Sequence, residues 1–231
     1  MAGLAALWSI VVAGVLAYSS ALHAQQLVSV PAPDGGIVLA DAYGTGDRGV
    51  VLAHGGRFDK SSWEKQARAL AKDGFRVLAI DFRAAVQSRA GQQPACLYDE
   101  SCLAVDVLAA VRYLRRAGAK TVSVVGASLG GGAAAQATAT GEGEIDRVVL
   151  LAHMLIAAPE RMKGRKLFIV SRDDSGSGDR PRLPGIRDQY EKAPGPKELI
   201  ILEGSAHAQF IFETPEGERL MREILRFLSA P

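Results

Sequence analysis

The sequence predicts one α/β domain built on an eight-stranded, mostly parallel, doubly wound sheet with helices on both faces. Short apolar runs rich in β-branched residues alternate with helix-like segments along most of the chain, which is the element order of such sheets. The composition, 48% hydrophobic and 23% charged in 231 residues, fits a globular domain with a sizeable core. One serine between two glycines follows an apolar strand, at the sheet edge where such folds carry their sites.

The expected strands come in two groups. The first two are separated by the turn-forming segment Pro31–Gly36 and should form an antiparallel hairpin. The other six are short apolar runs, as expected for parallel strands buried on both faces. In chain order the eight strands are expected at Leu27–Val30, Ile37–Ala42, Gly49–Ala53, Phe75–Ile80, Thr121–Val125, Arg147–Leu151, Lys166–Val170 and Glu198–Leu202.

Helices are expected between these strands. Ser61 is a suitable cap for the first of them, and Gly74 and Gly118 are typical residues after a helix end. The expected helices are Ser61–Lys72, Asp99–Arg116, Gly130–Thr140, Ile186–Lys192 and a closing helix that starts at Thr214-Pro215 and runs through Arg226. The connection from His153 to Arg165 is too short for an additional domain, so we expect no large lid and an open site.

The first 24 residues have the pattern of a secretory signal peptide. Met1 to Ala24 contains no charged side chain and a long apolar run, and small residues allow cleavage after Ala21 or Ala24. The run lacks the usual basic residues before it, and an uncleaved membrane anchor is the alternative. We therefore expect a leader over residues 1–24, a folded domain over residues 25–231 without stable membrane insertion, and a secreted or periplasmic protein.

The cysteines and the net charge indicate which binding partners can be excluded. Cys96 and Cys102 are close enough to form a disulfide in an exported protein, with two free thiols as the alternative. A cysteine pair without a neighbouring histidine is a poor zinc site. The net charge of +2 is spread without a basic stripe, which argues against a nucleic-acid partner. The sequence contains no indication of oligomeric state.

The serine between two glycines indicates a nucleophile elbow. Gly126 and Gly130 remove side chains that would clash in a sharp turn from strand to helix, and Ser128 would then project above the sheet. A glycine turn with an incidental serine is the alternative reading of this motif.

A serine nucleophile needs an imidazole base and an orienting carboxylate. His207 follows the last expected strand, where a loop can bring it over Ser128. Two adjacent carboxylates follow the seventh strand: Asp174 is the expected acid, Asp173 is the reserve, and Asp179 is a more distant third candidate. An exposed or packing histidine is the alternative for His207.

The same chemistry needs two backbone N–H groups for the developing oxyanion. One is expected from Leu129, directly after the serine. The other is expected from the turn after the third strand, at Gly56 or alternatively at Arg57, because glycines there let the backbone approach a substrate. His54 in this turn is expected to have a structural role.

The His-Gly-Gly turn, the glycine-flanked serine with its additional Gly131, and the order Ser, Asp, His resemble the α/β-hydrolase superfamily over nearly all of the chain after Gln25. The lidless frame is most similar to the dienelactone hydrolase-like and carboxylesterase branches. That resemblance implies hydrolysis of a carboxylic ester or lactone through an acyl-enzyme, with no metal or cofactor. Dienelactone hydrolases proper carry cysteine at the elbow, so Ser128 favours ordinary ester cleavage.

One loop departs from that resemblance. Many relatives have Asp-x-Arg-Gly-x-Gly-x-Ser after the fourth strand, whereas this chain has alanine and valine near the glycine positions of Asp81–Ser88, so the loop should differ in shape. The resulting hypothesis is an exported serine esterase acting on small or polymeric esters. A lactonase, lipase or peptidase with the same triad, and a catalytically silent binding protein of this fold, are the alternatives.

Overall fold

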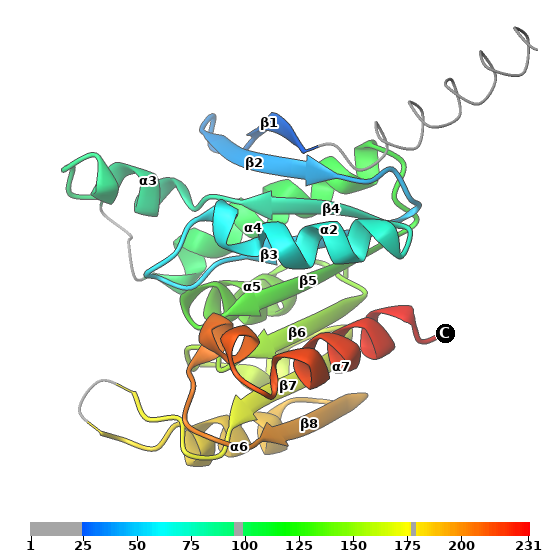
Figure 1. Ribbon diagram of the computed structural model, residues 1–231. Helices are drawn as coiled ribbons and strands as arrows, with labels where there is room; N and C mark the ends of the chain where they lie inside the picture. Colours follow the sequence, from blue (N-terminus) through cyan, green and yellow to red (C-terminus); the bar gives the residue numbers. More distant parts are fainter. Residues whose placement is uncertain (1–24, 95–98, 177–178) are drawn as a thin grey trace, which may run out of the picture.

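The computed structural model describes residues 25–94, 99–176 and 179–231. Its eight strands form one sheet in the order β1-β2-β4-β3-β5-β6-β7-β8 (Figure 1). Strands β1 and β2 pair antiparallel, β2 pairs antiparallel with β4, and every other pair is parallel. The strands are β1 Gln26–Pro31, β2 Ile37–Tyr43, β3 Arg48–Ala53, β4 Phe75–Ile80, β5 Thr121–Ala127, β6 Arg147–Leu151, β7 Arg165–Ser171 and β8 Lys197–Leu202. The predicted eight-stranded, mostly parallel sheet is confirmed.

Helices cover both faces of this sheet. Helices α2 and α7 lie in front of it in Figure 1, and α4, α5 and α6 lie behind it. The helices are α2 Glu64–Lys72, α3 Arg83–Arg89, α4 Glu100–Arg116, α5 Leu129–Thr140, α6 Leu183–Lys192 and α7 Gly217–Ser229, with the 3-10 helices η1 Lys60–Trp63, η2 Pro159–Arg161 and η3 Ala208–Glu213. Because η2 is the only helical turn between β6 and β7, the connection there adds no lid domain, as predicted.

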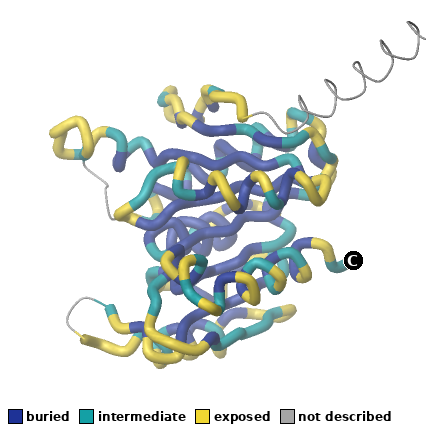
Figure 2. The backbone as a smooth tube through the Cα atoms, in the orientation of Figure 1, coloured by how far each residue is buried: buried dark blue, intermediate teal, exposed yellow. Residues whose placement is uncertain are grey.

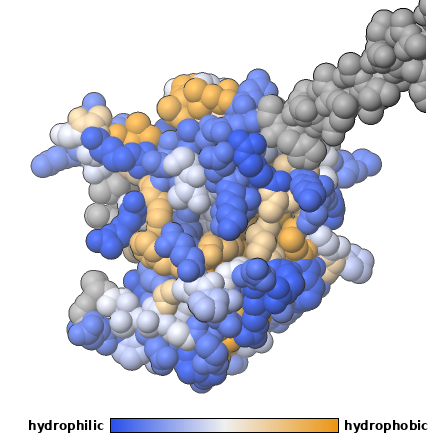
Figure 3. Space-filling view, viewed as in Figure 1, coloured by the Kyte–Doolittle hydropathy of each residue, from blue (hydrophilic) through white to orange (hydrophobic). Residues whose placement is uncertain are grey.

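The core lies in the central strands, which appear as the dark blue middle of Figure 2. Val50, Val124 and Val148 on three neighbouring strands are completely buried. β-Branched residues suit a pleated surface that is packed on both sides, which explains why these strands read as continuous apolar runs. The hairpin at the sheet edge differs, since Leu27 and Ile37 are exposed there. Figure 3 shows an apolar surface at this end of the molecule, over β1 and β2.

Helix boundaries differ from the expectations by more than one residue in three helices. The first expected helix starts as the 3-10 turn η1, and its cap is Asp59, whose side chain accepts from the Ser61 amide, rather than a serine. Helix α6 begins at Leu183 instead of Ile186, because Pro184 is accommodated in its first turn. Helix α7 begins at Gly217 and runs to Ser229, later and further than expected.

Helix α3 was not predicted. It occupies the loop in which this chain lacks the glycines of many relatives, and alanines there favour a helix. Asp106 of α4 holds its start, since its carboxylate accepts from the Arg83 amide at 3.0 Å and from Arg83 Nε at 2.6 Å. In this chain the segment after β4 is therefore a short helix whose start is fixed by α4.

Two predictions concern residues outside the described part of the chain. The leader over residues 1–24 and Cys96, the partner expected for Cys102, are not described, so cleavage and the disulfide stay predictions. Among the described residues, no helix is long and apolar enough to cross a membrane.

Close packing of α5 against the sheet depends on its glycines. A Cβ on Gly130 would overlap the carbonyl of Ala53 in β3, and a Cβ on Gly126 would overlap the carbonyl of Gly130. Both obstacles are backbone atoms, which cannot rotate away. These glycines therefore bring the start of α5, and Ser128 with it, close to the ends of β3 and β5.

Replacing Gly130 with alanine is expected to destabilise the fold by about 3 kcal/mol or more, because overpacking against backbone cannot be relieved by a rotamer change. The measurement is urea unfolding of the purified variant. Gly185→Ala in α6 is the matched control, since its Cβ meets only the exposed Leu155 side chain and alanine favours a helix. Equal stability of the two variants would contradict the packing argument.

Candidate active site

Ser128 occupies the sharp turn between β5 and α5. Its backbone is left-handed, with φ 50° and ψ −112°, a conformation that is costly for a residue with a side chain. Three hydrogen bonds hold it: its amide donates to Leu151 at 2.9 Å, and its carbonyl accepts from Gly132 at 3.0 Å and from Met154 at 2.9 Å. The strained corner leaves the Ser128 side chain partly accessible at the carboxyl edge of the sheet.

His207 connects Ser128 to a carboxylate. Its Nε2 lies 2.9 Å from Ser128 Oγ, and its Nδ1 lies 2.8 Å from Asp174 Oδ2. An ionised carboxylate can only accept, so Nδ1 of the neutral ring carries the proton and Nε2 is free to accept from the serine hydroxyl. The structure thus brings together the three residues expected to form the triad, from the segments after β5, β7 and β8.

The choice between the two adjacent carboxylates has a structural answer. Asp174 is completely buried, whereas Asp173 and Asp179 are exposed. A turn directs Asp174 inward: its amide donates to Ser171 at 3.2 Å, and its carbonyl accepts from Arg182 at 2.9 Å. The other carboxylate oxygen, Oδ1, lies 3.6 Å from Arg182 Nε, so a guanidinium stands next to the Asp174 carboxylate on the side away from His207 Nδ1.

The two residues expected to supply amides for an oxyanion, Gly56 and Leu129, are neighbours in the structure. A Cβ on Gly56 would be 3.6 Å from the Leu129 side chain, and Gly56 and Leu129 line one cavity of about 180 Å³. Leu129 is the first residue of α5, where amides have no acceptor within the helix. The amide of the preceding glycine, Gly55, is already bonded to Gln209 Oε1 at 2.8 Å. Arg57, the alternative to Gly56, lines the same cavity.

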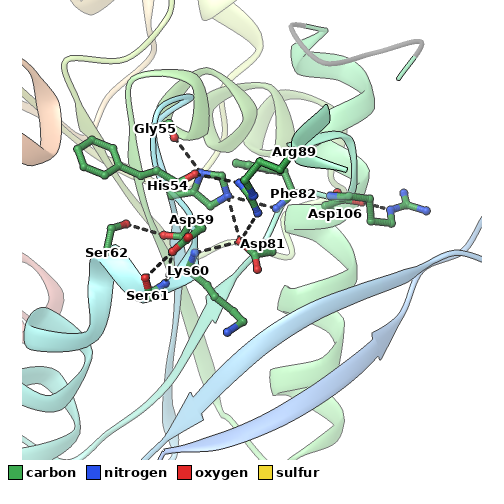
Figure 4. A network of polar contacts seen from close by, with 12 residues as sticks. His54, Gly55, Asp59, Lys60, Ser61, Ser62, Asp81, Phe82, Arg89 and Asp106 are labelled. Atoms are coloured by element: carbon green, nitrogen blue, oxygen red, sulfur yellow. Dashed lines mark hydrogen bonds and ion pairs between the residues drawn. The ribbon is translucent and has the colours of Figure 1, made fainter. Parts of the chain in front are cut away.

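His54 has no place in proton transfer in this geometry. Its Nδ1 donates to the Gly55 carbonyl at 2.8 Å, and its Nε2 accepts from the Phe82 amide at 3.3 Å (Figure 4). Burial lowers the pKa of His54, which keeps the ring neutral as this bonding pattern requires. Asp81, the residue directly after β4, accepts from the Lys60 amide at 3.0 Å, and so holds the start of η1, which follows the turn that contains Gly56.

His153 is a second buried histidine, next to the site but not part of the hydrogen-bonded chain. Its ring meets Phe168 edge-on with centroids 5.5 Å apart, and a Cβ on Gly131 would be 2.6 Å from the Cβ of His153. Desolvation by complete burial lowers the pKa of His153 to about 4. His153 is therefore neutral in the folded protein at neutral pH and fills space behind the elbow.

This burial makes stability depend on pH. The unfolded chain takes up the His153 proton near pH 6.5, but the folded chain only near pH 4. The unfolded state thus carries more protons between these values, and the free energy of unfolding falls as pH is lowered through the window. We expect this group to cost about 3 kcal/mol between pH 7 and pH 4. Urea unfolding at several pH values should show a shallower loss for His153→Gln; equal losses would contradict this assignment.

Residues around the site include some that the sequence did not indicate. The aromatic rings of Phe58 and Phe210 pack against each other with their centroids 5.0 Å apart, and Ile156 belongs to the core. Arg182 and Gln209 were missed. The only signal for Gln209 is a polar residue in the otherwise apolar run Ala208–Phe212.

Among the described residues no His, Cys, Asp and Glu side chains cluster as a metal site.

A serine, a histidine and a carboxylate in one hydrogen-bonded chain at the carboxyl edge of a doubly wound sheet form the arrangement of a serine hydrolase. Comparison with known families agrees with the fold: residues 49–211 match the family described as alpha/beta hydrolase fold. The chain belongs to this family.

Solved structures of similar fold include a dienelactone hydrolase and esterases. A dienelactone hydrolase from Anabaena variabilis superposes with a TM-score of 0.72 at 21% identity, covering 89% of this chain and 97% of its own. An esterase from Pyrococcus furiosus gives 0.71 at 18% identity, covering 90% and 94%, and an esterase from Exiguobacterium antarcticum gives 0.68 at 15% identity, covering 89% and 100%. At these identities the likeness is one of fold.

Proposed function

We propose that this protein is an exported serine hydrolase that cleaves carboxylic esters through an acyl-enzyme. The observation that carries the proposal is the chain of hydrogen bonds from Ser128 Oγ through His207 to Asp174. A serine hydroxyl is a weak nucleophile at neutral pH, and this chain is the arrangement that activates it.

Each residue has one role in the proposed reaction. Ser128 Oγ attacks the ester carbonyl while His207 Nε2 takes its proton, and Asp174 holds the imidazole and stabilises its charge. The amides of Gly56 and Leu129 stabilise the oxyanion of the tetrahedral intermediate. His207 then gives the proton to the leaving alcohol. Water, activated by the same imidazole, attacks the acyl-enzyme, and the acid is released with Ser128 restored.

The cavity beside these amides supports a preference for short acyl groups. It holds about 180 Å³ and is lined by polar residues as well as by Gly56 and Leu129, among them Asp59, Ser88 and Arg89. A long alkyl chain would have to desolvate these groups without providing hydrogen bonds to them. The absence of a domain between β6 and β7 leaves room for a bulky or polymeric alcohol side.

A panel of p-nitrophenyl esters from acetate to decanoate, together with lactones and polyesters, tests the proposal. We expect hydrolysis of the acetate and butyrate esters with kcat/KM falling for longer chains. A lactone as the best substrate would instead favour the reaction that the name of the Anabaena protein indicates. Folded protein that hydrolyses no member of the panel would contradict an esterase.

Export is a separate part of the proposal and rests on the uncharged apolar run of residues 1–24. Mass spectrometry of the protein from a bacterial expression host should find it outside the cytoplasm with an N-terminus after Ala21 or Ala24. The same sample should lack a free thiol at Cys102, as expected for a bridge to Cys96. An intact Met1 in the membrane fraction would contradict cleavage.

A further inference from the structure

Gln209 joins the segment that carries His207 to the turn that carries Gly56. Its side chain is nearly buried and lies in η3, two residues after His207. The Oε1 atom accepts from the Gly55 amide at 2.8 Å, and Nε2 donates to Ser62 Oγ at 2.7 Å. Gly55 lies 154 residues before Gln209 in the sequence, and Ser62 lies 147 residues before it. One side chain thus connects segments that are distant in the sequence.

The bond to Gly55 bears on the direction of the Gly56 amide. The Gly55 carbonyl and the Gly56 N–H belong to one planar trans peptide and point in opposite directions. That carbonyl accepts from His54 Nδ1 at 2.8 Å and from the Phe58 amide at 3.0 Å. Gln209 accepts from the amide of Gly55, so both the amide and the carbonyl of Gly55 are held by hydrogen bonds. These bonds fix the orientation of the peptide that carries the Gly56 N–H.

The position of Gly55 places this peptide directly beside the nucleophile. A Cβ on Gly55 would be 3.4 Å from Gln209 Oε1 and 3.5 Å from the Ser128 Cβ. The residue that follows Gln209 adds an apolar contact in the same direction, because Phe210 packs against Phe58 of the turn. The segment that carries His207 is therefore joined to the turn that carries Gly56 by two contacts: the polar contact of Gln209 and the aromatic contact of the adjacent Phe210.

We propose that Gln209 is a positioning residue for the oxyanion donor at Gly56, and that it couples the placement of this donor to the placement of His207. The inference rests on the proposed serine-hydrolase function. Loss of the Gln209 bonds leaves the buried Gly55 amide without its acceptor and frees the turn to rotate. A misdirected Gly56 N–H weakens an interaction made mainly in the transition state, so kcat falls while KM does not change.

Steady-state kinetics of Gln209→Leu, Gln209→Asn and Ser62→Ala test the proposal. Leucine has a similar size but no polar group, and asparagine is too short to reach both partners. Both Gln209 variants should lower kcat by about 10- to 100-fold and leave KM within about 3-fold of wild type. This loss is equal to or smaller than the loss of kcat expected when one oxyanion donor is removed completely. Ser62→Ala keeps the Gly55 bond and should retain kcat within about 3-fold.

Two further readouts separate positioning from stability. Titration with a fluorophosphonate counts the competent sites, so that kcat refers to folded enzyme. The inhibition constant of a trifluoromethyl ketone, which forms a tetrahedral adduct with a serine, should rise by the same factor as kcat/KM falls. Gln209→Asn that is folded and has wild-type kcat overturns the inference, as does a fall in melting temperature without a change in kcat. If wild-type turnover does not depend on Ser128, the proposed function itself has failed instead.

Discussion

Replacing Ser128 with alanine is expected to lower kcat for a p-nitrophenyl ester by about 10⁴-fold or more, the scale on which loss of a serine nucleophile acts. The variant removes the only hydroxyl bonded to His207 Nε2 among the described residues. It should fold, because alanine is smaller and the backbone bonds of residue 128 to Leu151 and Met154 do not involve its side chain.

Ser205→Ala is the matched control for this variant. Ser205 is an exposed serine in the same loop as His207, so it tests for general damage to the histidine segment. Its kcat should stay within about 2-fold of wild type, as is usual for an exposed side chain. Turnover by Ser128→Ala equal to that of wild type would contradict the assignment of Ser128 as the nucleophile.

Asp174→Asn is expected to lower kcat by about 10⁴-fold while the protein stays folded. An amide in this place can present its N–H₂ to His207 Nδ1, which then cannot donate, and the ring takes the tautomer that carries its proton on Nε2. That tautomer has no lone pair for the Ser128 proton. Because residue 174 is buried, water also cannot take over the stabilisation of the imidazolium that the lost negative charge provides.

Asp173→Asn distinguishes this mechanism from a general effect of charge in the loop. Asp173 is adjacent in sequence, exposed, and follows the same strand, so both variants remove the same charge from the same loop. We expect Asp173→Asn to keep kcat within about 2-fold. Similar losses for the two variants, or the larger loss for Asp173→Asn, would contradict the assignment of Asp174.

Much of the fold was predictable because local patterns and long-range packing agree in it. Three of the five residues of Thr121–Val125 are valines because helices cover both faces of β5. The glycines at 126 and 130 are required by close contacts with the backbone at the start of α5. Ser128 and His207 were also predictable, since each follows a strand that ends at the same edge of the sheet.

What could not be read from the sequence depends on contacts between distant segments. Helix α3 was missed because its start is held by Asp106, on another helix. Asp174 was the expected acid with Asp173 in reserve, and the contact with His207 agrees with that choice; the two side chains have the same chemistry, and the turn after β7 decides which one faces inward. The role inferred for Gln209 depends on bonds to Gly55 and Ser62, which no local pattern encodes.

The central claim is that Ser128 forms a covalent intermediate, and labelling with a fluorophosphonate tests it most directly. Mass spectrometry of the intact folded protein should show one adduct, peptide mapping should place it on Ser128, and Ser128→Ala should take up none. Folded wild-type protein that gains no adduct, or that carries it on another residue, would contradict the account.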